Sequence, residues 1–285
     1  MRALDPEVAD SVWAGIEGLI PVLVDTHPLG CHRLRAPDRD CFQVILVRLA
    51  TGCSWQDAER LCGNKVSDTT ARSRRNEWLT AGVLDAVAAE AISAYDRIIG
   101  LDLSDVAVDG SLHKSPCGGP GTGPNPTDRG KLGWKWSILT ERDGIPLGWT
   151  ADGANRNDSI LLAPTLDAAA ERGLLTDVET IWLDRGYDSE ITRQRLGDRG
   201  LNDAIIAKKR KRGSLQPKNK NQPMGLRWPV ERTNSWLSNF GQLRRNTDRK
   251  TVHRLAQLAL AVAFLLTAKL IDWQNRWSPP PSPIR

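Results

Sequence analysis

Residues 1–100 have apolar positions at the spacing of amphipathic helices. The segment "FQVILVRLA" stops just before Thr51 and Gly52, where a glycine can close a helix. Ser54 and Ser67 are suited to begin two further helices, because a serine hydroxyl accepts a hydrogen bond from the first turn. A short helix, a tight turn and a second helix are typical of a helix-turn-helix, so the sequence predicts such a motif here.

The second helix of this pair, in "DTTARSRRNEWLTAGVL", carries Arg72, Arg74 and Arg75. Because the second helix of such a motif enters the major groove, we expect these three arginines to contact DNA. A plain helical bundle whose arginines face solvent is the alternative.

After Gly100 the pattern changes to short apolar runs with the length of strands. Strands are predicted at 105–111, 134–140, 144–151, 180–183 and 203–208, and helices at 158–172, at 190–199 and around Glu231. Three strands followed by alternating helices and strands predict an α/β fold with one mixed sheet. We therefore expect a helical domain over 1–100, an α/β domain over 101–276 and an extended proline-rich tail over 277–285.

The composition is that of a soluble globular protein, with 40% hydrophobic and 26% charged residues. The apolar segment 255–271 is interrupted by Gln257, Thr267 and Lys269, which favours a buried core helix over a membrane span. Prolines interrupt the glycines of the loop "GPGTGPNPTDRG", and no helix follows them. We therefore expect no nucleotide-binding loop and no organic cofactor.

The five cysteines form no C-x-x-C pair, which indicates reduced thiols in a cytoplasmic protein rather than disulfides. A zinc site is the alternative, but the ligand spacings do not match known zinc patterns. Its candidate ligands are Cys31, His32, Cys41, Cys53 and Cys62.

Positive charge is concentrated in one block of the chain. Residues 208–254 hold fourteen Lys or Arg and two acids, a net charge of +12 in a chain whose total is +5. Such a block usually marks a polyanion partner, and the apolar residues interleaved from 226 to 240 favour nucleic acid over a solvated arm. The residues expected to contact phosphates are Lys208, Lys209, Arg210, Arg227, Arg232, Arg244 and Arg245.

Two of the predicted strands end in an aspartate, Asp109 after "VAV" and Asp184 after "IWL". If these strands are neighbours, the two carboxylates repel each other unless a cation lies between them. Oxygen ligands with no His or Cys nearby indicate Mg²⁺ or Mn²⁺. Ordinary turn residues at strand ends are the alternative interpretation.

Glu231 supplies a third carboxylate, in the first turn of a helix that begins near Pro229. A helix-terminal acid favoured by the helix dipole is the alternative interpretation. Taken together, three such carboxylates beside a polyanion-binding block predict metal-assisted phosphodiester chemistry with two ions.

Several motifs carry a family resemblance over about residues 39–270: "VAVDGS", "GANRNDS", "WLDRGYDS", "PVERTNSWL…LRRNTDR", "RLATGCSWQDAERLCG" and "RNEWLTAGVLDAV". On these motifs the chain resembles the DDE transposases of bacterial insertion sequences, in the group that includes insertion sequences four and five. The resemblance implies a ribonuclease-H-like fold for the α/β domain. It also implies that Asp109, Asp184 and Glu231 form a catalytic triad that holds two Mg²⁺ or Mn²⁺ ions.

The same resemblance implies a helix motif of Tyr, two residues, Arg, three residues, Glu, six residues and Lys. Arg227 and Glu231 fit this spacing, whereas Met224 and Ser238 stand at the tyrosine and lysine positions. Arg244 or Arg245 is then expected to supply the missing cation.

The implied activity is cleavage of the transposon ends and their joining to target DNA. The implied partner is double-stranded DNA, at the terminal inverted repeats and the target, bound by a homodimer at the nucleoid in the bacterial cytosol, away from membranes. A catalytically inactive DNA-binding protein and a metal-dependent nuclease without strand transfer stay open as alternatives. We expect a structural role for Tyr187 and core positions for Trp228 and Trp236.

Overall fold

The computed structural model describes residues 3–22, 34–207 and 228–277. Contacts divide the chain into a helical unit, Met1–Ile99 with Ala256–Arg285, and a sheet unit, Gly100–Leu255. We had expected one α/β domain over 101–276, and this boundary is wrong for the residues from Ala256 on. Their apolar side chains pack in the helical core, where Phe264 stacks on Phe42 with ring centroids 6.2 Å apart.

The helical unit is built from short helices with recognisable ends. Gly52 closes α2 in the left-handed conformation at φ 75°, and the hydroxyls of Ser54 and Ser67 cap α3 and α4, all as predicted. Gly82 separates α4 from α5, so the predicted single helix is two. The helices are α1 (Pro6–Leu19), α2 (Asp38–Thr51), α3 (Trp55–Leu61), α4 (Asp68–Thr80), α5 (Val83–Ile98) and, from Ala256 on, α10 (Thr251–Trp277).

By length and composition alone, α10 could cross a membrane. However, 56% of its most apolar stretch is buried inside the protein, including the run Leu258–Phe264. This burial favours the interpretation of α10 as a core helix.

The sheet unit contains one mixed sheet of six strands in the order β2-β3-β1-β5-β6, with β4 paired to β3. β1 is antiparallel to β3 and parallel to β5, so the predicted α/β class with a mixed sheet is confirmed. The two-residue β2 lies in a segment predicted to be loop, and it forms because Gly123 pairs with Gly133. The strands are β1 (Asp105–Lys114), β2 (Gly123–Pro124), β3 (Leu132–Thr140), β4 (Pro146–Gly153), β5 (Thr180–Leu183) and β6 (Ala204–Ile206).

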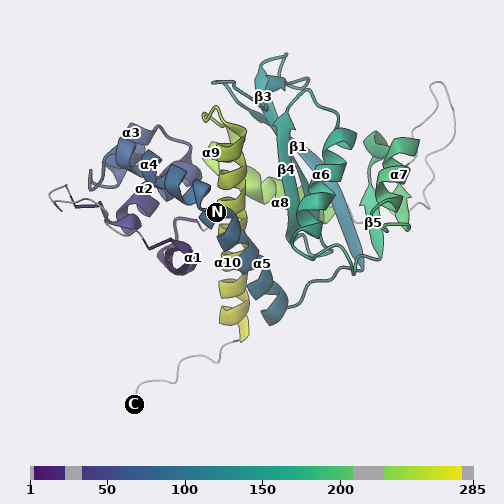
Figure 1. Ribbon diagram of the computed structural model, residues 1–285, viewed down its shortest axis with the longest axis horizontal. Helices are drawn as coiled ribbons and strands as arrows, with labels where there is room; N and C mark the ends of the chain where they lie inside the picture. The colour runs from purple at the N-terminus through teal and green to yellow at the C-terminus, as the bar shows by residue number, and fades with distance from the viewer. Residues whose placement is uncertain (1–2, 23–33, 208–227, 278–285) are drawn as a thin grey trace. The chain divides into compact units, whose positions relative to one another are not determined.

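Helices α6 and α8 cover opposite faces of this sheet (Figure 1). Alternate residues of β1 point to the two faces. Val108 packs in the core with Leu162 of α6, whereas the neighbouring Asp109 is hydrogen-bonded to Asn234 of α8. The helical elements of the sheet unit are α6 (Asp158–Ala170), η1 (Arg185–Tyr187), α7 (Glu190–Gly197), α8 (Trp228–Ser238) and α9 (Gly241–Arg244).

The fully buried Arg254 organises the loop between β1 and β2. Its guanidinium donates hydrogen bonds to the carbonyl oxygens of Pro120 at 2.7 Å, Gly118 at 3.0 Å and Arg249 at 3.3 Å. A side chain at Gly119 would overlap the Arg249 carbonyl, and φ there is +106°, so only glycine fits this close approach. One cation thus satisfies several buried carbonyls at once.

We expect Arg254→Met to destabilise the protein by about 3 kcal/mol or more, because it leaves these buried acceptors without donors. The exposed Arg249 is the matched control, and Arg249→Ala should change the free energy of unfolding by less than about 0.5 kcal/mol. Urea unfolding of the two variants checks this. Equal midpoints would mean that Arg254 does not hold the loop.

Candidate functional site

The parallel pairing of β1 with β5 places two carboxylates side by side. The register pairs Asp105 with Thr180 and Ala107 with Trp182. Continued by two residues, it sets Asp109 level with Asp184, and the period of two puts both on the same face. Trp182 donates a hydrogen bond to Asp105 at 2.7 Å on that face, which fixes the alignment of the two strands.

Helix α8 packs on β1 and β3 and is held there by Asn234. The Asn234 amide nitrogen donates to Asp109 Oδ2 at 3.4 Å, and its oxygen accepts from Trp136 Nε1 at 2.7 Å. Glu231 lies one turn earlier on α8 and is exposed. Residues three apart are neighbours on a helix surface, so Glu231 and Asn234 share a side of α8.

The three predicted carboxylates are brought together only in part. Asp109 and Asp184 are level on neighbouring strands, and Glu231 lies one turn from the residue that contacts Asp109. Within the described ranges, no three His, Cys, Asp or Glu side chains are close enough to hold one ion. The triad therefore stays a prediction, and the zinc alternative gains no support from the described cysteines.

Tyr187, three residues after Asp184, is buried beneath the aspartates. Burial raises the pKa of its hydroxyl well above the ordinary value, and the nearby charges of Asp158, Asp109 and Asp184 raise it further. Both effects keep the phenol protonated. Tyr187 packs in the hydrophobic core of the sheet unit, in line with the expected structural role.

Asp158 is a fourth carboxylate near the site, and sequence reasoning missed it. The buried Lys135 donates from Nζ to Asp158 Oδ1 at 2.8 Å and to the Arg156 carbonyl at 2.9 Å. A Cβ at Gly110, the residue after Asp109, would overlap the Asp158 carboxylate. The segment "GANRNDS" contains Asp158 and was noted for the family resemblance, but no role was assigned to it.

The prediction that Arg72, Arg74 and Arg75 of α4 contact DNA requires exposed side chains, and two of the three are buried. Arg74 is 3% exposed and Arg75 is 5% exposed. Arg74 donates to the Ala36 carbonyl at 3.2 Å and pairs with Asp38, while Arg75 lies over the Trp55 ring at 5.1 Å. Their partners lie far away in the sequence, so helical spacing alone did not reveal the burial.

Arg72 is exposed as predicted, and it pairs with Asp68 on the same helix at 2.5 Å. Residues 1–99 hold eleven Lys or Arg and fourteen Asp or Glu. This part of the chain is therefore acidic, in contrast to the basic block 208–254.

One prediction about α8 also needs correction. Trp228 is 56% exposed, so the expectation that it packs in the core is wrong. The Arg232 guanidinium lies over the Trp228 ring at 4.2 Å and over the Trp236 ring at 4.6 Å. Arg232, expected to contact DNA, thus stacks between two indoles of its own helix.

The other residues predicted to contact phosphates divide into two groups. Arg244 and Arg245, at the end of α9, are exposed. Lys208, Lys209, Arg210 and Arg227 lie outside the described residues, as does Met224 of the predicted helix motif.

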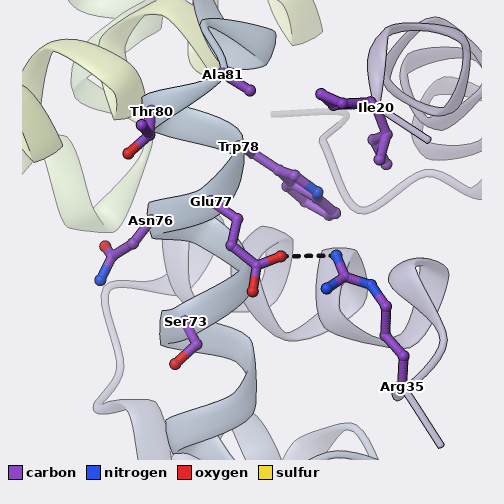
Figure 2. Close-up of a pocket in the computed structure, with 9 residues that line it drawn as sticks. Ile20, Arg35, Ser73, Asn76, Glu77, Trp78, Thr80 and Ala81 are labelled. Atoms are coloured by element: carbon purple, nitrogen blue, oxygen red, sulfur yellow. Dashed lines mark hydrogen bonds and ion pairs between the residues drawn. The ribbon is translucent and has the colours of Figure 1, made fainter. Parts of the chain in front are cut away.

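The helical unit contains a cavity of about 660 Å³ beside α4. Figure 2 shows Trp78 extended from α4 toward Ile20, and Glu77 joined to Arg35 across the cavity. A guanidinium nitrogen of Arg35 lies 2.7 Å from Glu77 Oε2, so the two charges neutralise each other. The cavity therefore lacks the excess positive charge that a phosphate-binding surface needs.

Comparison with known proteins agrees with this arrangement. Residues 8–88 match the family described as "Putative transposase of IS4/5 family", and residues 100–267 match the family described as "Transposase DDE domain". The "Putative transposase for insertion sequence element IS402" of Burkholderia cepacia is 42% identical over 138 residues, which are 47% of this chain and 62% of that protein. The chain thus matches less than two thirds of the length of this relative.

A second relative from the same organism is the "Insertion element IS402 uncharacterized 16.2 kDa protein". It is 31% identical over 123 residues, which are 42% of this chain and 82% of that protein.

We expect Arg74→Met to destabilise the protein by about 2–4 kcal/mol, because it removes the donor of the Ala36 carbonyl and one of the two arginines that pair with Asp38. Arg72→Met is the matched control on the same helix, and its effect should stay within about 0.5 kcal/mol. Thermal unfolding followed by circular dichroism checks both variants. If the two melt alike, Arg74 is not a core residue.

Proposed function

The chain belongs to the family of DDE-domain transposases, and we propose that it cleaves DNA at transposon ends and joins the freed ends to target DNA. The α/β unit is the catalytic unit, with a ribonuclease-H-like fold, and α3 and α4 form a helix-turn-helix-type pair. The observation that supports the proposal is the parallel pairing of β1 with β5, whose register, extended by two residues, brings Asp109 level with Asp184, together with the hydrogen bond from Asn234 of α8 to Asp109.

The donor set suits a hard divalent cation. Asp109 and Asp184 offer carboxylate oxygens, and two negative charges on neighbouring strands favour a cation between them. Asp109, Asp184 and Glu231 would together hold Mg²⁺ or Mn²⁺, in two positions. Such ions supply an activated water at the scissile phosphate and stabilisation of the leaving 3′ oxygen.

The protein's own groups position the reaction. The Asn234 amide orients the Asp109 carboxylate, and the backbone N–H of Gly186 donates to Asp184 Oδ1 at 2.6 Å. Tyr187 keeps its proton, so no covalent protein–DNA bond through this residue is needed. The attack on the phosphate is then made by water and afterwards by the freed 3′-OH of the DNA.

The partner in this proposal is double-stranded DNA, at the terminal inverted repeats and at the target. Arg244 and Arg245 contact phosphates, and the protein acts as a homodimer on DNA in the bacterial cytosol. Because the contacts are charge-driven, affinity should fall steeply as the salt concentration rises.

The test is cleavage of a duplex that carries the inverted repeat flanking the gene, with Mg²⁺ present. Asp184→Asn and Glu231→Gln should each lower the cleavage rate roughly 100-fold or more, because each removes one ligand charge. DNA affinity should stay equal or rise, since a negative charge near the phosphates is lost.

Asp188→Asn is the matched control, because Asp188 is bonded to Arg193 at 2.6 Å and should not be needed for cleavage. Cleavage at the wild-type rate by Glu231→Gln would make Glu231 a helix-terminal acid only. A joined product of end and target DNA separates the transposase from a simple nuclease.

A further inference from the structure

The sheet unit contains a polar cavity of about 500 Å³, whose lining does not include Asp109, Asp184 or Glu231. We call it the basic cavity. It is formed by the last residues of β1, the loop after β2 and the end of α9. Its lining residues are Leu112, His113, Lys114, Asn125, Thr127, Asp128, Arg244 and Arg245.

Backbone hydrogen bonds fix the walls of the basic cavity. Lys114 pairs with Arg245 in a parallel bridge, and the Asn246 N–H donates to the Lys114 carbonyl at 2.9 Å. The loop is closed by the Asn125 N–H, which donates to the Lys131 carbonyl at 2.8 Å. Segments more than 100 residues apart are thus locked together, so the cavity is preorganised for a ligand.

The charge of the basic cavity is positive. Lys114, Arg244 and Arg245 face one acid, Asp128, which lies 3.7 Å from Lys114. Within the described residues, no group forms a hydrogen bond or ion pair with the side chain of Arg244 or Arg245. Two unpaired guanidinium groups at one cavity are suited to an anion with several oxygens, such as a phosphate.

A buried neutral donor adds to the cations. Asn125 is only 4% exposed, and its side-chain oxygen accepts from the backbone N–H and the hydroxyl of Thr127 at 3.0 and 2.9 Å. No described residue accepts a hydrogen bond from its amide nitrogen. Its amide N–H groups are therefore available to a ligand at the wall of the cavity.

His113 contributes no charge to this cavity. Burial lowers the pKa of its imidazole to about 3, and Nε2 shares a hydrogen bond with Ser111 Oγ at 2.8 Å. The ring also stacks on Trp136 with centroids 3.6 Å apart. The positive charge of the cavity therefore comes from Lys114, Arg244 and Arg245.

The basic cavity lies on the same strand as Asp109, three to five residues further along. At about 3.3 Å per strand residue, the separation is about 10–17 Å. Successive phosphates of one DNA strand advance by about 3.4 Å along the helix axis, so this separation corresponds to about three to five nucleotides.

We propose that the basic cavity binds one backbone phosphate of the DNA, three to five nucleotides from the phosphate that reacts at Asp109 and Asp184. This proposal rests on the proposed function. One fixed phosphate at that distance sets which bond of the end DNA reaches the carboxylates.

The first measurement is DNA binding by the full chain, with Ca²⁺ in place of Mg²⁺, as fluorescence anisotropy on the duplex with the flanking inverted repeat. Lys114→Ala and Arg245→Ala should each weaken binding about tenfold and lower the slope of log affinity against log salt by about one. Lys131→Ala is the matched control, because Lys131 is an exposed lysine of the same loop outside the cavity lining. Equal behaviour of all three variants would overturn the proposal.

The second measurement locates the phosphate. Single methylphosphonates, which are uncharged, replace successive phosphates of the duplex. Wild-type protein should lose about tenfold in affinity at one position, three to five nucleotides from the cleaved bond. Lys114→Ala and Arg245→Ala should lose nothing further at that position, because the contact is already absent. Interference that persists in both variants, or interference at no position, would overturn the proposal.

Competition with inorganic phosphate at constant ionic strength distinguishes two ligands of the basic cavity, a phosphate of the DNA backbone and a free phosphate ion. Suppose that inorganic phosphate displaces DNA from the wild-type protein but not from Lys114→Ala, and that no single methylphosphonate weakens binding. The basic cavity would then bind free phosphate, and the proposal would be overturned. The proposed function is tested separately, by cleavage of the same duplex by wild-type protein with Mg²⁺. If no cleavage occurs, the proposed function fails, but the binding measurements still report on the basic cavity.

Discussion

The parallel pairing of β1 with β5 is the constraint on which the site depends. Side chains alternate along a strand, so a register shift of one residue would send Asp184 to the α6 face and leave Asp109 without its neighbour. Three interactions hold the register: the backbone hydrogen bonds between the strands, the hydrogen bond from Trp182 to Asp105, and the packing of Ile181 and Leu183 in the core. The chemistry at the end of the strands is thus fixed by packing further down the same strands.

Much of the fold could be predicted because its signals are local. Ser54 and Ser67 begin helices through their own hydroxyls, and Gly52 ends one through its left-handed backbone. The apolar runs before Asp109 and Asp184 were visible in the sequence, but the prediction that the first strand ends at Asp109 is wrong, because β1 continues to Lys114 along its pairing with β3. The pairing of β1 with β5 was a hypothesis that needed the sheet order, which the sequence does not contain.

The remaining differences come from contacts between distant segments. Arg74 is buried because the Ala36 carbonyl and Asp38 fold back on it, and nothing within α4 indicates this. The residues of α10 from Ala256 on pack with Phe42, which lies more than 200 residues earlier. Lys135 and Asp158 meet only because β3 and α6 are adjacent. Buried charged residues are the hardest features to predict, because their burial depends on partners that lie far away in the sequence.

The ion pair of Lys135 with Asp158 has a consequence for the order in which the site is assembled. The charges of Asp158, Asp109 and Asp184 all act on the Tyr187 hydroxyl, and three like charges in this region would oppose the closing of the sheet. Lys135 neutralises one of the three from within the chain. The polypeptide can therefore complete its fold with only two like charges facing each other. Folding of the sheet unit would then need no bound cation as a template.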